Sequence, residues 1–354
     1  MYEYTHGGNI YDASGYAREN IIDFSANINP LGIPDEVMAA ASASLARSNI
    51  YPDSSCRLLS SRLAEFEEVA EASIFCSNGA SDILFRLAVA VKPKKILVTA
   101  PSFADYERAG VAAGAEIIYY FLKKENDFNI DEDIIDLIID TSPDIVFICN
   151  PNNPTGNLTD TETLREIAKA CESVGSILML DECFIDFVCG SHRYSAKPLI
   201  GRYKNIVILK AFTKIFAMPG LRLGYAICGD IDLIEHIRFC GADWAVSNVA
   251  QEAGIAALGN AREYIENSCE YVKEQREYII RELKRMNFAV YPSQANFILI
   301  YSPREIKLKN IVIRDCSNFK GLEAGYYRIA VLTEEKNKLL IEAIKGAKII
   351  CQKQ

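Results

Sequence analysis

Lys214 is the residue of this sequence whose neighbours most clearly predict a chemical role. It lies in an apolar run directly after Thr213, and Arg222 follows eight positions later in a segment that contains Gly220 and Gly224. An isolated lysine in apolar surroundings usually extends its charged end to the surface. A lysine that forms a Schiff base instead needs a dry, cation-rich pocket that lowers its pKa, and a nearby phosphate anchor supplies the cation. This combination predicts pyridoxal phosphate chemistry, provided that other segments hold the rest of the cofactor.

Two further segments have the features of anion and amide contacts to such a cofactor. The first, Ser77-Asn78-Gly79-Ala80-Ser81, follows an apolar run and opens a predicted helix, so its backbone amides can form a phosphate cup. The second runs from Asn150 to Gly156 and contains two Asn-Pro units, which make a rigid turn that aims an amide side chain into a cleft. A helix cap and a plain loop are the ordinary alternatives for these two segments.

Two other residues could contact the ring of a flat heterocycle. Phe103 follows the apolar run 95–99 and could stack on the ring, although such an aromatic is more often part of a core. Asp181 directly follows the apolar residues 177–180. A carboxylate there could keep a pyridine nitrogen protonated, which lets the ring accept electrons. A helix N-cap is the competing interpretation of Asp181.

These side chains need a sheet that brings them to one edge. Short apolar runs alternate with helix-like segments, and near-continuous apolar runs are typical of strands covered on both faces. We expect a mostly parallel, seven-stranded α/β sheet, whose ligands bind at the carboxyl ends of its strands. The predicted strands are Ser73–Ser77, Lys95–Thr99, Glu116–Phe121, Asp144–Cys149, Ser176–Asp181, Asn205–Leu209 and Leu223–Cys228. A helix is predicted over Thr159–Val174, with Thr159 and Glu162 as a capping box.

After about Trp244 the pattern changes to that of an α+β unit. We expect a long helix over Asn260–Met286 and a last helix from about Glu334. The short strands predicted here are Phe288–Tyr291, Asn296–Tyr301, Ile311–Arg314 and Tyr326–Val331. The expected organisation is an N-terminal segment (1–45) that joins a small domain, a large cofactor-binding domain (46–245) and the small α+β domain itself (246–354).

Composition excludes several classes of function. A net charge of −9 argues against a nucleic-acid surface, and no run of 18 apolar residues suggests a membrane span. The start of the chain lacks the basic and apolar regions of a signal peptide. The eleven cysteines are scattered without a Cys-x-x-Cys pair, and with only three histidines no metal site is expected. We therefore expect a cytoplasmic protein with reduced thiols.

Taken together, the order and spacing of these motifs resemble the fold-type I pyridoxal-phosphate enzymes, over essentially the whole chain. The similar branch contains histidinol-phosphate aminotransferase and threonine-phosphate decarboxylase. The resemblance implies that Lys214 bonds to the cofactor, Asp181 pairs with the ring nitrogen, Asn153 contacts the ring hydroxyl and Phe103 stacks on the ring. It also implies a set of residues around the cofactor phosphate: Gly79, Ala80, Ser81, Thr213 and Arg222. Tyr51, in Tyr51-Pro52-Asp53, would reach the neighbour's phosphate, which implies a homodimer with shared active sites.

Three features favour the decarboxylase within this branch. His6-Gly7-Gly8-Asn9-Ile10-Tyr11 and the segment Asp23–Gly32, which includes Asn27, are similar to the N-terminus of the decarboxylases. Phe184 stands where the aminotransferases commonly have a tyrosine. Arg314 and Arg328, on predicted neighbouring strands, could clamp the two anions of a phosphorylated amino acid. By resemblance Arg314 binds the substrate phosphate, Arg328 binds the other anionic end, and His6 and Asn27 complete the substrate site.

The expected reaction is decarboxylation of L-threonine O-3-phosphate to (R)-1-amino-2-propanol O-2-phosphate, which in this family feeds the side chain of cobalamin. L-Serine phosphate would fit the same anchors, because one methyl group gives only about 1–3 kcal/mol of discrimination. Ala211 and Leu332 depart from the family pattern, since a hydroxyl residue and an arginine are common there. Two alternatives stay open: a histidinol-phosphate-type aminotransferase, and a non-catalytic module that senses pyridoxal phosphate.

Overall fold

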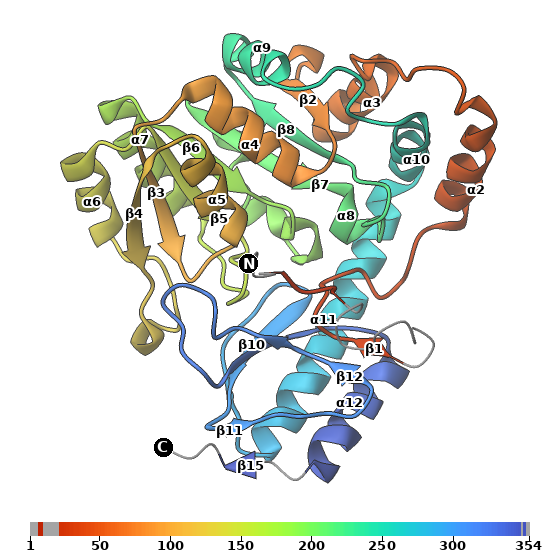
Figure 1. Ribbon diagram of the computed structural model, residues 1–354, viewed down its shortest axis with the longest axis vertical. Helices are drawn as coiled ribbons and strands as arrows, with labels where there is room; N and C mark the ends of the chain where they lie inside the picture. The colour runs from red at the N-terminus through yellow and green to blue at the C-terminus, as the bar shows by residue number, and fades with distance from the viewer. Residues whose placement is uncertain (1–5, 10–20, 348–349, 352–354) are drawn as a thin grey trace.

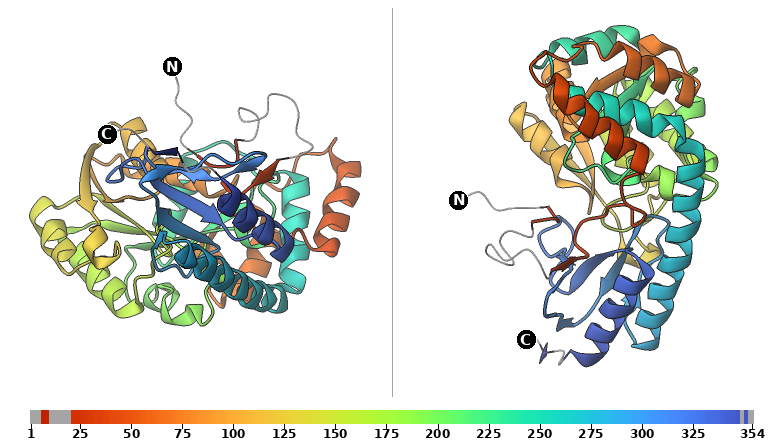
Figure 2. Two further views of the ribbon diagram at one scale, coloured as in Figure 1. Left: turned by 90° about the horizontal axis from the view of Figure 1, so that it is seen from below. Right: turned by 90° about the vertical axis from the view of Figure 1, so that its right-hand side faces the viewer.

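The computed structural model describes residues 6–9, 21–347 and 350–351. Figure 1 shows an upper unit built on a large sheet and a lower unit built on a smaller one. A single long helix, α11 (Ala261–Arg285), runs along both units, as the side view of Figure 2 also shows. The predicted helix Asn260–Met286 is thereby confirmed to within one residue at each end.

The upper sheet has seven strands in the order β2-β8-β7-β6-β5-β3-β4, and only β8 runs antiparallel to its neighbours. The predicted mostly parallel α/β sheet is confirmed. Its strands are β2 (Ile74–Ser77), β3 (Lys95–Ala100), β4 (Glu116–Phe121), β5 (Ile145–Cys149), β6 (Ile177–Asp181), β7 (Ile206–Ala211) and β8 (Gly224–Cys228).

Helices cover both faces of this sheet, which explains why its central strands are apolar throughout. In β5, Val146 and Ile148 belong to one buried cluster while Ile145 and Phe147 belong to another, so side chains of both faces are buried. The helices of the upper unit are α2 (Asp35–Ser44), α3 (Arg57–Glu67), α4 (Ala80–Val91), α5 (Ala104–Ala112), α6 (Asp133–Thr141), α7 (Thr161–Val174), α8 (Phe212–Ile215), α9 (Ile231–Phe239) and α10 (Asn248–Gly259).

The predicted capping box of α7 is wrong. Asp160 is the N-cap, and its side chain accepts a hydrogen bond from the Thr163 amide at 2.8 Å. Thr159 is engaged elsewhere, because its backbone pairs in both directions with the side chain of Asn150 (2.8 and 3.0 Å). Thr159 therefore fixes the turn after β5 instead of capping the helix.

The lower unit has a sheet of order β13-β14-β10-β9, with α11 and α12 (Glu334–Gly346) packed together. Its strands are β9 (Ala289–Val290), β10 (Phe297–Tyr301), β13 (Arg314–Asp315) and β14 (Tyr326–Ala330). The single strand predicted over Ile311–Arg314 is wrong. β12 (Ile311–Val312) pairs in parallel with β1 (Ile22–Asp23), whereas β13 pairs with β14, so the two halves have different partners. A further short pair joins β11 (Arg304–Glu305) to β15 (Ile350–Cys351).

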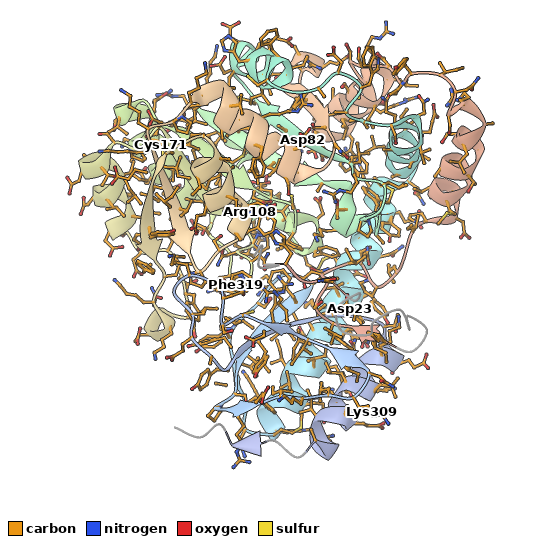
Figure 3. The ribbon with its side chains drawn as sticks, in the orientation of Figure 1. Asp23, Asp82, Arg108, Cys171, Lys309 and Phe319 are labelled. Atoms are coloured by element: carbon orange, nitrogen blue, oxygen red, sulfur yellow. A yellow bond between two sulfur atoms is a disulfide. The ribbon has the colours of Figure 1, made fainter. Side chains whose placement is uncertain are left out.

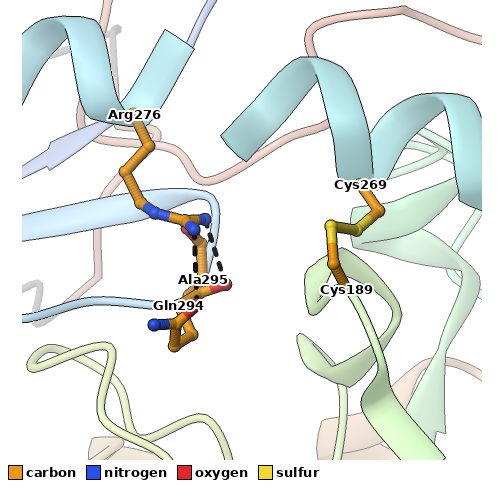
Figure 4. Close-up of a disulfide and its surroundings, with 5 residues drawn as sticks. All are labelled: Cys189, Cys269, Arg276, Gln294 and Ala295. Atoms are coloured by element: carbon orange, nitrogen blue, oxygen red, sulfur yellow. Dashed lines mark hydrogen bonds between the residues drawn. A yellow bond between two sulfur atoms is a disulfide. The ribbon is translucent and has the colours of Figure 1, made fainter. Parts of the chain in front are cut away.

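A disulfide between Cys189 and Cys269 ties α11 to the upper unit (Figure 4). Two turns further along the same helix, Arg276 donates to the backbone carbonyls of Gln294 and Ala295, just before β10. The expectation of reduced thiols is therefore wrong for this one pair, which lies 80 positions apart in sequence with Cα atoms at 5.7 Å. Eight other cysteines of the described residues carry free thiols.

Within the described ranges, no helix is long and apolar enough to cross a membrane, and no three potential metal ligands cluster together. The predictions for the first five residues and for Ile10 and Tyr11 fall outside those ranges.

Candidate active site

One cavity lies where the carboxyl ends of the upper sheet's strands face the lower unit. Its wall combines the loops after β2, β3, β5, β6 and β7 with residues 6–7 and 25–27 and with three residues of the lower unit, Arg314, Phe319 and Arg328. Figure 3 labels Arg108 on α5 and Phe319 of the lower unit on the two sides of this boundary. Twelve of the predicted site residues line the cavity: His6, Asn27, Ala80, Ser81, Phe103, Asn153, Asp181, Thr213, Lys214, Arg222, Arg314 and Arg328. Gly79 and Tyr51 do not.

Lys214 is held in the cavity by α8, the short helix that follows β7. Burial lowers the pKa of its amine to about 8, and the charges of Arg328 and Arg222 act in the same direction. Its Nζ lies 5.7 Å from the centre of the Phe184 ring. A lysine with this pKa has an appreciable neutral fraction near pH 7, which a nucleophilic amine requires.

Asp181 ends β6 and is fixed from two sides. One carboxylate oxygen accepts from the hydroxyl of Tyr106 at 2.6 Å, and the other accepts from the Cys183 amide at 2.9 Å. Burial raises the pKa of Tyr106 well above its ordinary value, so the phenol keeps its proton and stays a donor. No α-helix begins at Asp181, which excludes the helix-cap interpretation. The carboxylate is thus an oriented acceptor in the cavity wall.

Arg328 is the buried cation of the lower unit. It donates to Asn153 Oδ1 and, at 2.6 Å, to the Ser25 carbonyl. Because Asn153 Oδ1 is occupied in this way, the amide nitrogen is the atom left to donate to a ligand. Burial lowers the pKa of Arg328 to about 10, so it is still charged at neutral pH.

Arg314 lies directly opposite Arg328 in the β13–β14 pair. It is more exposed than Arg328 and donates to the Asp315 carbonyl and, at 2.8 Å, to Asn318 Oδ1. The centre of the Phe319 ring lies 5.1 Å from its guanidinium carbon. The register therefore places two guanidinium groups side by side, one deep in the cavity and one at its outer side.

The phosphate cup predicted before α4 depends on close backbone approaches. A Cβ added to Gly79, whose φ is +85°, would lie 2.7 Å from Arg222 Nη2. One added to Gly224 would lie 2.7 Å from the Ala80 amide nitrogen. Only glycine leaves room for this packing, which brings the amides at the start of α4 next to the Arg222 guanidinium.

These residues fit pyridoxal phosphate. The cup combines helix N-terminal amides with a cation, and the partly buried amine of Lys214 has a lowered pKa. A fixed carboxylate and an amide nitrogen that can donate lie in the same wall. The buried Oδ1 of Asn27 also has no protein partner, although it lines the cavity, and is available to a ligand. Ala211 lines the cavity without a hydroxyl, so it adds no hydrogen bond to a phosphate.

Tyr51 lies away from the cavity of its own chain. Its side chain is 77 % exposed, and its ring centre is 4.7 Å from that of Trp244. The role of Tyr51 at a neighbour's phosphate requires a second chain and stays a prediction.

Several lining residues were not predicted, including Ser25, Asp105 and Phe319. Asp105 accepts from Ser81 Oγ at 2.7 Å, so this hydroxyl proton is directed away from the cup. The only sequence signal for Asp105 was its place two residues after Phe103, at the start of a helix.

Comparison with known proteins agrees with this geometry. The sequence profile of the aminotransferase class I and II family matches residues 19–344. The chain is 33% identical to threonine-phosphate decarboxylase of Salmonella typhimurium, over 98% of this chain and 97% of that one. It is 31% identical to histidinol-phosphate aminotransferase of Methanosarcina mazei, over 98% and 94%. The crystal structure of histidinol-phosphate aminotransferase from Clostridium acetobutylicum superposes with a TM-score of 0.83 at 33% identity, over 91% of this chain and 98% of that one.

Proposed function

This chain belongs to the class I and II aminotransferase family, and within that family we propose that it decarboxylates L-threonine O-3-phosphate, with pyridoxal 5'-phosphate as cofactor. The product would be (R)-1-amino-2-propanol O-2-phosphate, a precursor of the cobalamin side chain. The observation that carries the proposal is the set of three potential cations, His6, Arg314 and Arg328, that line one cavity with Lys214.

The two arginines suit the two ends of a phosphorylated amino acid. Arg328 is buried close enough to Lys214 to affect its pKa, so it is placed to bind the carboxylate next to the reacting carbon. Arg314 is nearer the outer side, where a phosphate would extend. Guanidinium groups bind both anions bidentately. L-Serine phosphate has the same two anions and should be a second, poorer substrate.

Each remaining residue has a role in binding or proton transfer. Pyridoxal phosphate, when bound, supplies a conjugated ring that accepts the electrons of the broken bond. Asp181, held by Tyr106 and Cys183, would keep a ring nitrogen protonated. Lys214 Nζ, neutral in part near pH 7, would deliver or remove a proton at the α carbon. Arg328 would fix the angle of the carboxylate, and the bond held perpendicular to the ring is the one that breaks.

Two observations support decarboxylation over amino transfer. Phe184, which has no hydroxyl, lies over Lys214 Nζ where a tyrosine would have presented one. The His6-Gly7 segment also lines the cavity beside the two arginines. The competing proposal is a histidinol-phosphate-type aminotransferase, supported by relatives of similar identity. A homodimer and a cytoplasmic location remain predictions of the sequence.

Product analysis separates the two proposals. Purified enzyme loaded with cofactor should release carbon dioxide and an amino alcohol phosphate from threonine phosphate, without a 2-oxo acid. A 2-oxo acid in place of carbon dioxide, or efficient amino transfer from histidinol phosphate to 2-oxoglutarate, would refute decarboxylation. Lys214→Ala should abolish turnover.

A matched pair of arginine variants tests the clamp. Arg314→Gln should raise KM for threonine phosphate by about a hundredfold, the loss of a bidentate ionic contact. Arg304→Gln, on β11 of the same unit but outside the cavity, should leave KM unchanged.

A further inference from the structure

Asp105 is a buried carboxylate in the cavity wall that the proposed reaction does not use. It lies in the first turn of α5, and its side chain is 7% exposed. One oxygen accepts from Ser81 Oγ at 2.7 Å. The other is 3.1 Å from His6 Nε2 and accepts from Arg108 Nη1 at 2.9 Å. Asp105 is therefore in contact with the phosphate cup on one side and with the N-terminal segment on the other.

Residues 6–8 pack tightly against Ser25 and Arg328 next to this carboxylate. A Cβ added to Gly7 would lie 2.0 Å from the Ser25 carbonyl oxygen and 3.1 Å from Arg328 Nη2. The Gly8 amide donates to Ser25 Oγ at 2.8 Å. Ser25 is in turn held by Asp23, which pairs with the lower unit through β1. The segment is thus anchored to the lower unit by Gly8 and to the upper unit by His6.

The contacts that hold His6 at the mouth of the cavity include Phe103, Asp105 and Arg108, whose Nη1 lies 3.3 Å from His6 Nε2. The ring centre of His6 is 5.2 Å from that of Phe103, and its Nε2 lies against Asp105. Burial by itself raises the pKa of Asp105, but the hydrogen bonds from His6 and Ser81 outweigh this and hold the pKa below its usual range. The carboxylate is charged at neutral pH and attracts the donor atoms around it.

We propose that Asp105 is a positioning residue that fixes His6 over the cavity, so that residues 6–8 form the wall enclosing the phosphorylated end of the substrate. The proposal rests on the proposed function only in the choice of a phosphorylated substrate. Asp105 itself does not bind the substrate phosphate, since two anions in contact repel each other. Asp105 acts through His6, so the effect of replacing Asp105 should depend on whether His6 is present.

The test is a double-mutant cycle on KM for threonine phosphate. Asp105→Asn keeps the size of the side chain but removes its charge, and should raise KM about tenfold with kcat changed less than threefold, the effect of one hydrogen bond to a charged group. His6→Ala should have a similar effect. In the His6→Ala background, Asp105→Asn should raise KM less than twofold, because there is no longer a ring to position. If the two substitutions raise KM independently, so that their factors multiply in the double variant, the proposal is wrong.

Gly7→Ala provides a second route to the same result without altering a charged group. The added methyl cannot fit against the Ser25 carbonyl, so the segment must leave its place. KM should rise as in His6→Ala. Adding Asp105→Asn to the Gly7→Ala variant should raise KM by a further factor of less than two. An unchanged KM in Gly7→Ala would overturn the proposal. Glu107→Gln, on the same helix but outside this cavity, is the matched control and should match the wild type.

Binding of inorganic phosphate separates this proposal from the proposed function. The dissociation constant of phosphate, measured by calorimetry on the cofactor-loaded enzyme, should rise in all three variants, Asp105→Asn, His6→Ala and Gly7→Ala. If the enzyme fails to decarboxylate threonine phosphate but shows this pattern, the proposed function fails and the positioning role stands. If decarboxylation occurs and phosphate binding is unchanged in all three variants, the positioning role fails.

Discussion

Lys210 is buried and Lys214 is partly buried on the β7–α8 segment, yet their amines are predicted to react very differently. Burial lowers the pKa of Lys214 to about 8 from an ordinary value of 10.5. Burial acts on Lys210 in the same direction, but Asp186 and Glu67 outweigh it and raise its pKa well above the ordinary value. Lys210 Nζ lies 3.0 Å from Asp186 and 3.1 Å from Glu67, whereas the charges that act on Lys214 include two cations, Arg328 and Arg222, which together with burial outweigh the opposing effect of Asp181.

The magnitude follows from the two pKa values of Lys214. At pH 7.5 an amine of pKa about 8 is about one quarter neutral, whereas an ordinary lysine is neutral in about one molecule in a thousand. Only the neutral amine attacks an aldehyde, so Lys214 in the enzyme without cofactor should react on the order of a hundred times faster than a lysine of ordinary pKa and equal access.

Reductive methylation with formaldehyde and cyanoborohydride, followed by peptide mass spectrometry, measures this directly. Formaldehyde has no phosphate, so recognition by the phosphate cup cannot produce the selectivity. The methylation rate of Lys214 should rise with pH and level off above about 8, while Lys210 should react negligibly over the same range.

Substitution of the nearby cation tests the cause. Arg328→Met removes the second-largest contribution, so the plateau should move to higher pH but stay below 10.5, because burial remains. Arg276→Met, which removes a buried arginine on α11, should leave the plateau in place. A Lys214 rate that still rises beyond pH 10, or equal labelling of Lys210, would refute the reasoning.

Three further predictions concern stability and cofactor affinity. Lys210→Met leaves the partly buried Asp186 without its cation and the buried Glu67 with Lys197 alone, and should lower the free energy of unfolding in urea by about 3 kcal/mol. The triple variant with Glu67→Gln and Asp186→Asn should lose less, and a loss under about 1 kcal/mol in the single variant would contradict the role of this network. Burial raises the pKa of Glu182 to about 7 from 4.5, so the folded protein binds more protons than the unfolded chain between these values and this residue makes stability fall as pH rises through that window. Glu182→Gln should flatten that fall when urea unfolding is compared at pH 5 and pH 8, and an unchanged slope would exclude Glu182 as its source. Ala211→Ser restores a hydroxyl to the cavity and should tighten pyridoxal phosphate binding by roughly 1 kcal/mol, measured by fluorescence titration; no gain would mean that the hydroxyl cannot reach the phosphate.

The sheet was predictable because its strands are apolar on both faces. Strands such as β4 and β5 stand out in the sequence within one or two residues of their observed bounds. The cavity was largely predictable for a related reason, since ligand-binding residues follow the carboxyl ends of parallel strands. Asn153, Asp181 and Lys214 were placed in this way, and the structure brings all three to one cavity.

The features that were missed depend on contacts between distant parts of the chain. Asp105 meets partners 24 and 99 positions away, and Cys189 bonds to a cysteine 80 positions away. No local periodicity reports such contacts. The segment after Asn310 has an apolar pattern typical of one strand, but its two halves pair with β1 and β14, which lie far apart in sequence. Thr159 matches the sequence pattern of an N-cap, but its backbone pairs with the Asn150 side chain and Asp160 caps the helix instead.

The helix α11 is a single rigid element that contacts both units. Its 25 residues form a rod about 37 Å long, bonded to the upper unit at Cys269 and to the lower sheet at Arg276. Arg328 belongs to that lower sheet, whereas Lys214 and Asp181 belong to the upper one. If Arg328 binds the substrate carboxylate as proposed, a small tilt of the rod would change the angle at which it does so, and would also shift the Asn153 side chain to which Arg328 donates. Under the proposed function, we therefore expect the packing of buried side chains such as Val272 and Ile279, which do not line the cavity, to affect which bond breaks.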